Sequence, residues 1–271
     1  MGILNVTPDS FSDGGRFNET HAAVAHALNM ARAGADVIDV GGESSRPGAK
    51  RIAVAQQIER TTETIRGCRA ALDEAGFAKV VMSIDTTHAP VAQAALEAGA
   101  TVLNDISAGE EDPAMLRLAA ERNAPIILMH KQGPPATMQK APHYQDVVAQ
   151  VRDYLKGRVA AAKDAGVSQG LLAVDPGIGF GKTLDHNVAL LAGLDVLVGD
   201  GTPVLLGASR KRFLAHLQGH PELSAEPDPA GGSAATTALA VAAGVRMIRV
   251  HDVALHRQAA DTAWAIATLQ K

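Results

Sequence analysis

The sequence is poor in cysteine and in aromatic residues. Cys68 is the single cysteine among 271 residues, and aromatic residues make up only 3% of the chain. One cysteine excludes a disulfide framework and a cysteine-ligated metal cluster, and it is typical of a reducing compartment, so we expect a cytoplasmic protein. With 46% hydrophobic residues, the core is expected to consist mainly of Ala, Val, Leu and Ile.

Long apolar runs and an excess of basic residues are missing as well. No apolar stretch approaches about 18 residues, so the sequence predicts no membrane span. The N-terminus lacks the basic segment that precedes the apolar part of a secretion signal. The formal net charge of −4 argues against binding to nucleic acid or to an anionic membrane surface.

What the sequence does contain is a regular alternation of short apolar runs and Ala-rich helical patterns. Repeated about eight times, this alternation is typical of α/β proteins, and at this length it predicts a closed (β/α)8 TIM barrel. No interior segment resembles a linker, so we expect a single domain over residues 1–271, with Gly219–Gly232 as an enlarged connection. The expected strands are Gly2–Val6, Asp36–Val40, Val80–Asp85, Thr101–Asn104, Pro125–His130, Leu171–Asp175, Pro203–Ala208 and Met247–His251. The expected helices are His21–Ala33, Val54–Glu74, Ala89–Ala98, Pro113–Glu121, Tyr144–Ala165, Lys211–Leu217, Ala234–Ala243 and Val253–Leu269.

Polar side chains follow nearly every expected strand. The carboxyl ends of barrel strands form the face on which barrel enzymes place their chemistry. A single Asp after a strand is more often a helix N-cap, but a polar group after each strand of one rim indicates a site. These groups are Asn5, Asp39, Asp85, Asn104, Asp105, His130, Asp175, Ser209, Arg210, Lys211, Arg249, His251 and Asp252.

The last expected strand carries two basic side chains on one face. Alternation along the strand puts Arg249 and His251 on one side and Ile248 and Val250 on the other. If the apolar pair faces the helices, the basic pair faces the barrel mouth, where it favours an anion such as phosphate or pyrophosphate. The alternative is a buried Arg249 paired with one of the strand-end carboxylates.

Two motifs fail as common signatures. Asp175–Thr183 reads "DPGIGFGKT", in which Pro176 breaks a Walker A loop and Lys182 breaks a dinucleotide fingerprint. Its alternating glycines favour either close approach of the backbone to a flat ligand or a simple turn. Gly207–Phe213, "GASRKRF", does not match a serine-hydrolase elbow, and its basic residues suit either an anion or a solvated patch. The ten histidines include no HExxH zinc motif.

The segments after the first two expected strands are rich in Gly, Pro and Ser. They read "NVTPDSFSDGG", residues 5–15, and "GGESSRPGAK", residues 41–50. They are either ordinary surface loops or a pair of mobile flaps over the barrel mouth that exclude water.

Eight blocks in this order resemble the dihydropteroate synthase family, whose folate-pathway enzymes are inhibited by sulfonamides. They are "MGILNVTPDSFSDGG", "IDVGGESSRPGA", "SIDT", "LNDIS", "MH", "DPGIGFGK", "GASRK" and "RVHD", and they span nearly the whole chain. The resemblance implies a pterin-binding barrel that condenses 6-hydroxymethyl-7,8-dihydropterin diphosphate with 4-aminobenzoate and releases pyrophosphate. It also implies Mg²⁺ as the cofactor and a homodimer as the usual assembly.

The family pattern assigns roles to the residues that match it. It implies that Asp85, Asn104, Asp175 and Lys211 hold the pterin ring, since carboxylates accept N–H bonds from an aminopyrimidinone edge. Arg249 and His251 would hold the diphosphate, with Asn5 as a ligand of Mg²⁺ and Ser45 and Arg46 near the anion and the aminobenzoate. Lys211, Arg249, His251 and Asp85 are the expected catalytic residues. The expected pocket walls are Met129, Phe180 and Ser209.

The chain departs from the family pattern in two places. Ser45 stands where the family usually has Thr, which keeps the hydroxyl and loses a methyl group. Family members also usually have residues ahead of "MGILNVTP", so we expect an N-terminal strand or hairpin to be truncated here.

The residues argue against three other functions. A methyltetrahydrofolate–corrinoid methyltransferase would have no reason to keep two anion-handling flaps or the Arg249–His251 pair. A pterin-binding protein without catalysis would not need the intact set Asn5, Arg46, Lys211, Arg249 and His251. A Schiff-base aldolase would want a lysine within the barrel, where the sixth expected strand has Asp175.

Overall fold

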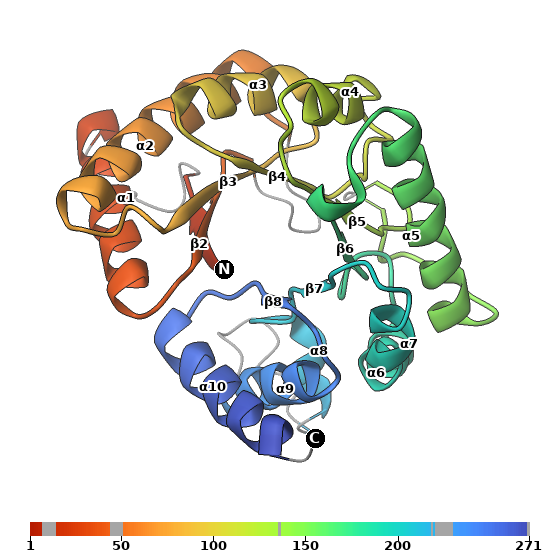
Figure 1. Cartoon of the computed structure of the whole chain (residues 1–271). Helices are drawn as coiled ribbons and strands as arrows, with labels where there is room; N and C mark the ends of the chain where they lie inside the picture. Colours follow the sequence, from red (N-terminus) through yellow and green to blue (C-terminus); the bar gives the residue numbers. More distant parts are fainter. Residues whose placement is uncertain (7–14, 44–50, 135–136, 218, 220–229, 270–271) are drawn as a thin grey trace.

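The strands of the chain form a closed parallel barrel (Figure 1). The computed structural model describes residues 1–6, 15–43, 51–134, 137–217, 219 and 230–269, of which 15–19 by their backbone alone. Neighbours in the chain pair in parallel from β1 to β6, and β7 pairs with β8. The strands are β1 Gly2–Asn5, β2 Val37–Gly41, β3 Val81–Asp85, β4 Val102–Asp105, β5 Ile126–Met129, β6 Leu172–Asp175, β7 Leu205–Leu206 and β8 Met247–Ile248.

Two single bridges complete the ring. Val174 of β6 pairs with Val204, which precedes β7, and Gly2 of β1 pairs with Val250, which follows β8. The amide of Ile3 donates to the carbonyl of Val250 at 2.9 Å, which joins the first strand to the last. The barrel predicted from the alternation of strands and helices is therefore confirmed.

The helices surround the barrel as an outer layer (Figure 1). Local sequence sets several of their ends: α3 stops at Gly99, whose φ of 116° suits glycine, and Thr183 and His186 form a capping box at the start of α6. The helices are α1 Gly15–Arg32, α2 Val54–Glu74, α3 Ala89–Ala98, α4 Ala114–Glu121, α5 Val147–Asp164, α6 Leu184–Ala192, α7 Leu194–Val198, α8 Arg212–Leu217, α9 Ala230–Ala242 and α10 Val253–Leu269, with a 3-10 turn at Gln169–Leu171.

The barrel interior is apolar at one end and polar at the other. Ile127, Ala173 and Leu205 point inward from three neighbouring strands and form a small buried cluster. Two positions further along these strands are Met129, Asp175 and Gly207. The carboxyl ends of the strands carry the acids Asp85 and Asp175 and the amide of Asn104. The apolar cluster therefore closes the amino-terminal end, and ligands can enter from the other.

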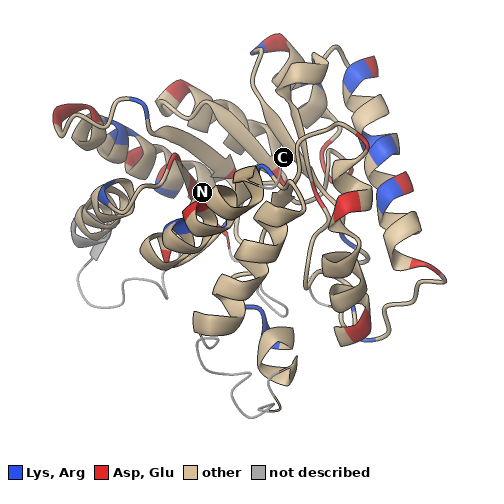
Figure 2. Cartoon of the chain, turned by 60° about the horizontal axis from the view of Figure 1, so that its bottom comes forward, with Lys and Arg blue, Asp and Glu red and all other residues tan. Residues whose placement is uncertain are grey.

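The outer surface mixes both signs of charge. Acidic and basic residues are interspersed along the outer helices in Figure 2. None of the described helices is both long enough and apolar enough to span a membrane.

Most predicted elements are present, and the differences are local. The last two strands are shorter than predicted, since β7 and β8 pair over two residues each, and Arg249 and His251 lie beyond the end of β8. Helices α6 and α7 were not predicted, since Gly193 interrupts the apolar pattern between them. Of the predicted connection Gly219–Gly232, residues 220–229 lie outside the described part.

Candidate active site

Asp39 organises the polar end of the barrel. Its side chain is fully buried at the centre of β2 and accepts hydrogen bonds from three neighbours. Ser83 Oγ donates at 2.5 Å, Asn104 Nδ2 at 3.0 Å and Arg249 Nε at 2.7 Å. The sequence marks Asp39 as a strand-end residue but gives it no role.

Arg249 lies between two carboxylates. Besides its bond to Asp39, the guanidinium donates to Asp85 Oδ2 at 2.8 Å. Ile248 and Val250 pack in the cores between strands and helices, so the predicted division of this strand into two faces is confirmed. The ion pairs match the alternative that the sequence left open, a buried arginine with strand-end carboxylates. An arginine has five N–H donors, and these two bonds leave others for an anion.

The Asp85 carboxyl is poised near neutrality. Burial raises its pKa to about 7, although the positive charge of Arg249 opposes this rise. Asp39 and Asp105 add like charge and raise the pKa further. A carboxyl in this environment can accept hydrogen bonds or share a proton with a ligand ring.

A second group of predicted residues gathers on β5, β6 and the loop after β7. Asp175 is buried, and burial raises its pKa while a hydrogen bond from the amide of Gly177, at 2.7 Å, lowers it. Lys211 Nζ lies 4.1 Å from the centre of the Phe180 ring, a cation–π contact. Burial lowers the pKa of Lys211 to about 8, helped by the positive charge of Arg249. Met129, at the end of β5, is also buried and lies beside Gly177.

The glycines of "DPGIGFGKT" are required by close approach of the backbone. Gly177, Gly179 and Gly181 all have positive φ. A Cβ at Gly177 would overlap the carbonyl oxygen of His130, and one at Gly181 would overlap that of Gln132. The loop is therefore pressed against the residues that follow β5, and it brings Phe180 to the ammonium group of Lys211.

A buried lysine holds this loop in place. Lys182 Nζ donates to the carbonyls of Gly177 at 2.9 Å and Phe180 at 3.1 Å, and it lies 2.9 Å from His130 Nδ1. Burial lowers the pKa of Lys182 to about 7. Burial and the charge of Lys182 lower the pKa of His130 to about 3, so its ring is neutral. In the sequence Lys182 is only a mismatch to known motifs, and this role is not visible there.

The remaining predicted residues lie around the same mouth or outside the described chain. Ser209 Oγ and His251 Nδ1 are 3.2 Å apart, and the amide of His251 donates to Ser209 Oγ at 3.3 Å. Asn5 Oδ1 lies over Gly41, beside the Asp85 side chain. Ser45 and Arg46 lie outside the described residues.

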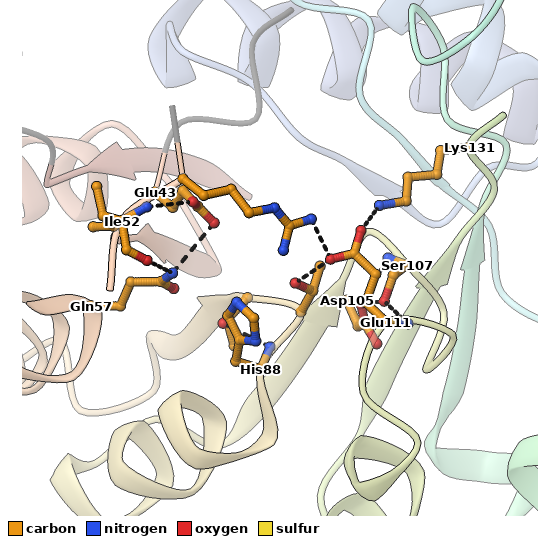
Figure 3. Close-up of polar contacts among 11 residues, drawn as sticks. Glu43, Ile52, Gln57, His88, Asp105, Ser107, Glu111 and Lys131 are labelled. Carbon is orange, nitrogen blue, oxygen red and sulfur yellow. Dashed lines mark hydrogen bonds and ion pairs between the residues drawn. The ribbon is translucent and has the colours of Figure 1, made fainter. Parts of the chain in front are cut away.

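Glu111, in the loop after β4, links the loops that follow β2, β3 and β5 (Figure 3). Its carboxylate accepts from Arg51 at 2.5 Å, from Thr87 Oγ1 at 3.0 Å and from Lys131. Burial opposes ionisation, but the bonds from Lys131 and Arg51 lower the pKa of Glu111 to about 2. Glu111 could not be found from sequence, because no motif places an acid in the loop after β4.

The donors suit a flat polar ring beside an anion. Carboxylates and the amide of Asn104 face one side of the mouth, and Lys211, Arg249 and His251 supply cations or N–H donors. In the part of the chain that is described, no group of three or more His, Cys, Asp or Glu side chains is placed to hold a metal ion.

Comparison with known proteins finds a matching family and similar curated proteins. The pterin binding enzyme family matches residues 1–251. A dihydropteroate synthase from Synechocystis is 43% identical over 270 residues, which cover 97% of this chain and 89% of the relative. One from Mycobacterium leprae is 46% identical over 257 residues, which cover 93% and 88%.

Solved structures give the same result. Xanthomonas albilineans dihydropteroate synthase with 4-aminobenzoic acid superposes with a TM-score of 0.87 at 42% identity, covering 98% of this chain and 92% of that one. The same enzyme in complex with 7,8-dihydropteroate gives a TM-score of 0.83 at 41% identity, covering 98% and 92%.

Proposed function

Because the chain belongs to the pterin binding enzyme family, and within it to the dihydropteroate synthases, we propose that its barrel mouth joins 6-hydroxymethyl-7,8-dihydropterin diphosphate to 4-aminobenzoate. The products are 7,8-dihydropteroate and pyrophosphate, so the enzyme is a pterinylmethyl transferase. The observation that carries the proposal is the convergence of buried acids and basic groups at one end of the barrel. The relatives with 4-aminobenzoic acid and 7,8-dihydropteroate support the choice of ligands.

The pterin ring would lie between the two polar groups of the mouth. Asp85 and Asp175 can accept N–H bonds from the aminopyrimidinone edge, while Asn104 and Lys211 donate to ring nitrogen and oxygen. Phe180 and Met129 supply apolar walls for the flat faces of the ring. Asp39 holds Asn104 and Arg249 in place through the contacts at 3.0 and 2.7 Å.

The diphosphate would lie beside Arg249 and His251, with Mg²⁺ as the proposed cofactor. Asn5 fits a role as a ligand, because its amide oxygen faces the space over Gly41 that a Cβ would fill. Mg²⁺ prefers oxygen ligands and often takes few from the protein, the rest from phosphates and water. When bound, the ion would neutralise charge on the leaving pyrophosphate. Ser45 and Arg46 are proposed to meet the anion and the aminobenzoate.

The chain's own residues suit a dissociative reaction. Arg249 and His251 would stabilise the charge that builds on the departing pyrophosphate. The carboxylates of Asp85 and Asp175 would stabilise the cationic pterin methylene. The neutral aniline nitrogen then attacks this carbon, and the proton that the nitrogen loses passes to the released pyrophosphate. This sequence of steps needs no strong base. It does need water to be excluded, and the apolar floor of Ile127, Ala173 and Leu205 serves this from below.

The assembly and the location are separate proposals. A homodimer is supported by apolar side chains that α9 and α10 expose, among them Leu239 and Trp264. A cytoplasmic location is supported by Cys68, a free and buried thiol.

A product assay tests the proposal directly. Purified protein with Mg²⁺, the pterin diphosphate and radiolabelled 4-aminobenzoate should form dihydropteroate. Replacing Lys211 with Met should lower kcat/KM for the pterin substrate by about 100-fold, because a cation at the ring is lost. Arg212→Met changes the exposed neighbour and should stay within about twofold of the unchanged protein. Pterin binding without any product at high enzyme concentration would overturn the synthase proposal in favour of a binding protein.

A further inference from the structure

A cavity of about 510 Å³ lies on the outer side of the barrel, away from the polar mouth. It is bounded by α5, by β6 and by the segment that follows α7, elements that lie next to one another in Figure 1. Gln169 and Thr202, which also line it, precede β6 and β7, so this cavity opens toward the amino-terminal end of the strands. Its size is within the range of about 300–1,000 Å³ that small-molecule sites occupy.

The floor of the cavity is apolar. Leu155 and Val159 of α5, Val174 of β6 and Leu197 of α7 line it. Leu155, Val174 and Leu197 are buried, so a ligand that entered would contact ordered core side chains. An apolar ring or branched chain is the kind of group that such a floor accommodates.

The rim of the cavity is basic. Arg152, Lys156 and Lys163 are four and seven residues apart along α5, which places them on one face of the helix. Asp200 is the single acid among the lining residues, and it is held by Arg152 through Nε at 2.8 Å and Nη2 at 2.5 Å. The lining therefore carries three positive charges and one negative charge, an excess of two.

The walls are held together before any ligand binds. The Arg152–Asp200 pair ties α5 to the segment after α7, and Gln169 Nε2 donates to Thr202 Oγ1 at 3.3 Å. A preformed cavity loses little conformational entropy on binding.

We propose that this cavity is a second binding site, for a small amphipathic anion with an apolar body and a carboxylate, sulfonate or phosphate head. The apolar body would lie against Val174 and Leu197, and the head would meet Lys156 and Lys163. The site is separate from the pterin mouth and does not depend on the reaction proposed there. Val174 faces the cavity, while Asp175, the next residue of the same strand, faces the mouth.

Fluorescence of 8-anilinonaphthalene-1-sulfonate tests the site, because this probe combines an aromatic body with one sulfonate. Titrations are run with the pterin substrate at saturation, so that the mouth is filled. The double variant Lys156→Glu and Lys163→Glu should weaken probe binding at least about tenfold. The control Lys79→Glu, at an exposed lysine outside the cavity, should leave the affinity within about twofold.

A second variant separates loss of charge from loss of space. Ala160→Trp places a large side chain at the exposed edge of the cavity and leaves every lysine intact. It should also weaken binding of the probe, while circular dichroism and the melting temperature show that the fold is kept. Equal affinity in the unchanged protein, the double variant and Ala160→Trp would overturn the proposal.

Discussion

At the scale of single residues, Lys182 holds the loop that carries Phe180 in position at the barrel mouth. Replacing it with Met removes the donors to the carbonyls of Gly177 and Phe180. This loop carries Phe180, whose ring contacts the ammonium group of Lys211. The KM for the pterin substrate should therefore rise about tenfold, whereas the KM for aminobenzoate should stay within about twofold. Steady-state kinetics with each substrate varied in turn measure both. Lys140→Met, at an exposed lysine, is the control, and an unchanged pterin KM in the Lys182 variant would contradict this role.

The same residue makes a pH prediction. The pKa of Lys182 is lowered to about 7 in the folded protein, whereas an unfolded lysine keeps a pKa near 10.5. Between these values the unfolded state binds more protons, so the contribution of Lys182 to the free energy of unfolding rises with pH. Urea denaturation gives the free energy of unfolding of the unchanged protein and of Lys182→Met at pH 7 and at pH 9.5. The difference between the two proteins, in favour of the unchanged one, should be larger at pH 9.5. A difference that shrinks as the pH rises would have the wrong sign.

How far the sequence predicts the site is also a matter of single residues. Strand ends and the alternation of side chains are enough to place Asp85, Asp175 and Arg249 at the mouth. The pairing of Arg249 with Asp39 does not follow from the sequence, because it joins residues 210 positions apart. The role of Lys182 cannot be predicted for a different reason. Its partners are backbone carbonyls, which every residue has, so no residue type identifies them.

At the scale of elements, Glu111 fastens the loop after β4 to its neighbours. Its partners Arg51 and Lys131 come from the loops after β2 and β5. Arg51 directly follows residues 44–50, and Glu43, which precedes them, accepts from the amide of Ile52 at 3.0 Å. The two ends of the segment that carries Ser45 and Arg46 are thus tied to defined positions (Figure 3).

Glu111→Gln tests whether these ties matter for the substrate that Ser45 and Arg46 are proposed to meet. Glutamine keeps the size and loses the charge that holds Arg51 and Lys131, so the KM for aminobenzoate should rise about five- to tenfold. The KM for the pterin substrate should stay within about twofold. Glu110→Gln, at the adjacent acid that binds Tyr154, serves as the matched control. Equal changes in both KM values would refute a role specific to aminobenzoate.

The sequence predicts the bounds of a helix best where its run of apolar and Ala residues is long. The bounds of α2, α3 and α10 agree with prediction, because each has a long amphipathic or Ala-rich run, and Gly99 ends α3. β7 and β8 pair over two residues each, since their remaining partners come from the single bridges that close the ring. A closure formed by contacts between distant segments is not a property of either segment alone.

At the scale of the whole molecule, closure of the barrel brings the first and last strands together. The amide of Val250 donates to the carbonyl of Met1 at 2.9 Å, so Asn5 and Arg249 end on the same side of one ring. This explains why residues near both ends of the chain belong to one site. It also leaves α9 and α10, which pack on each other, on the outside of the ring (Figure 1).

The outer face of these two helices predicts how copies of the molecule associate. Leu239 is 65% exposed, Trp264 53% and Ile266 57%, and burying large apolar side chains such as these favours association of two copies. We expect a homodimer in sedimentation velocity, and the double variant Leu239→Glu and Ile266→Glu should sediment as a monomer, because dimerisation would bury its new charges. Leu217→Glu, at a leucine of α8 that is 53% exposed, should remain dimeric. Trp264 is the single tryptophan, so its emission should shift to longer wavelength in the monomeric variant. If the double variant stays dimeric and Trp264 emission is unchanged, the interface does not lie on α9 and α10.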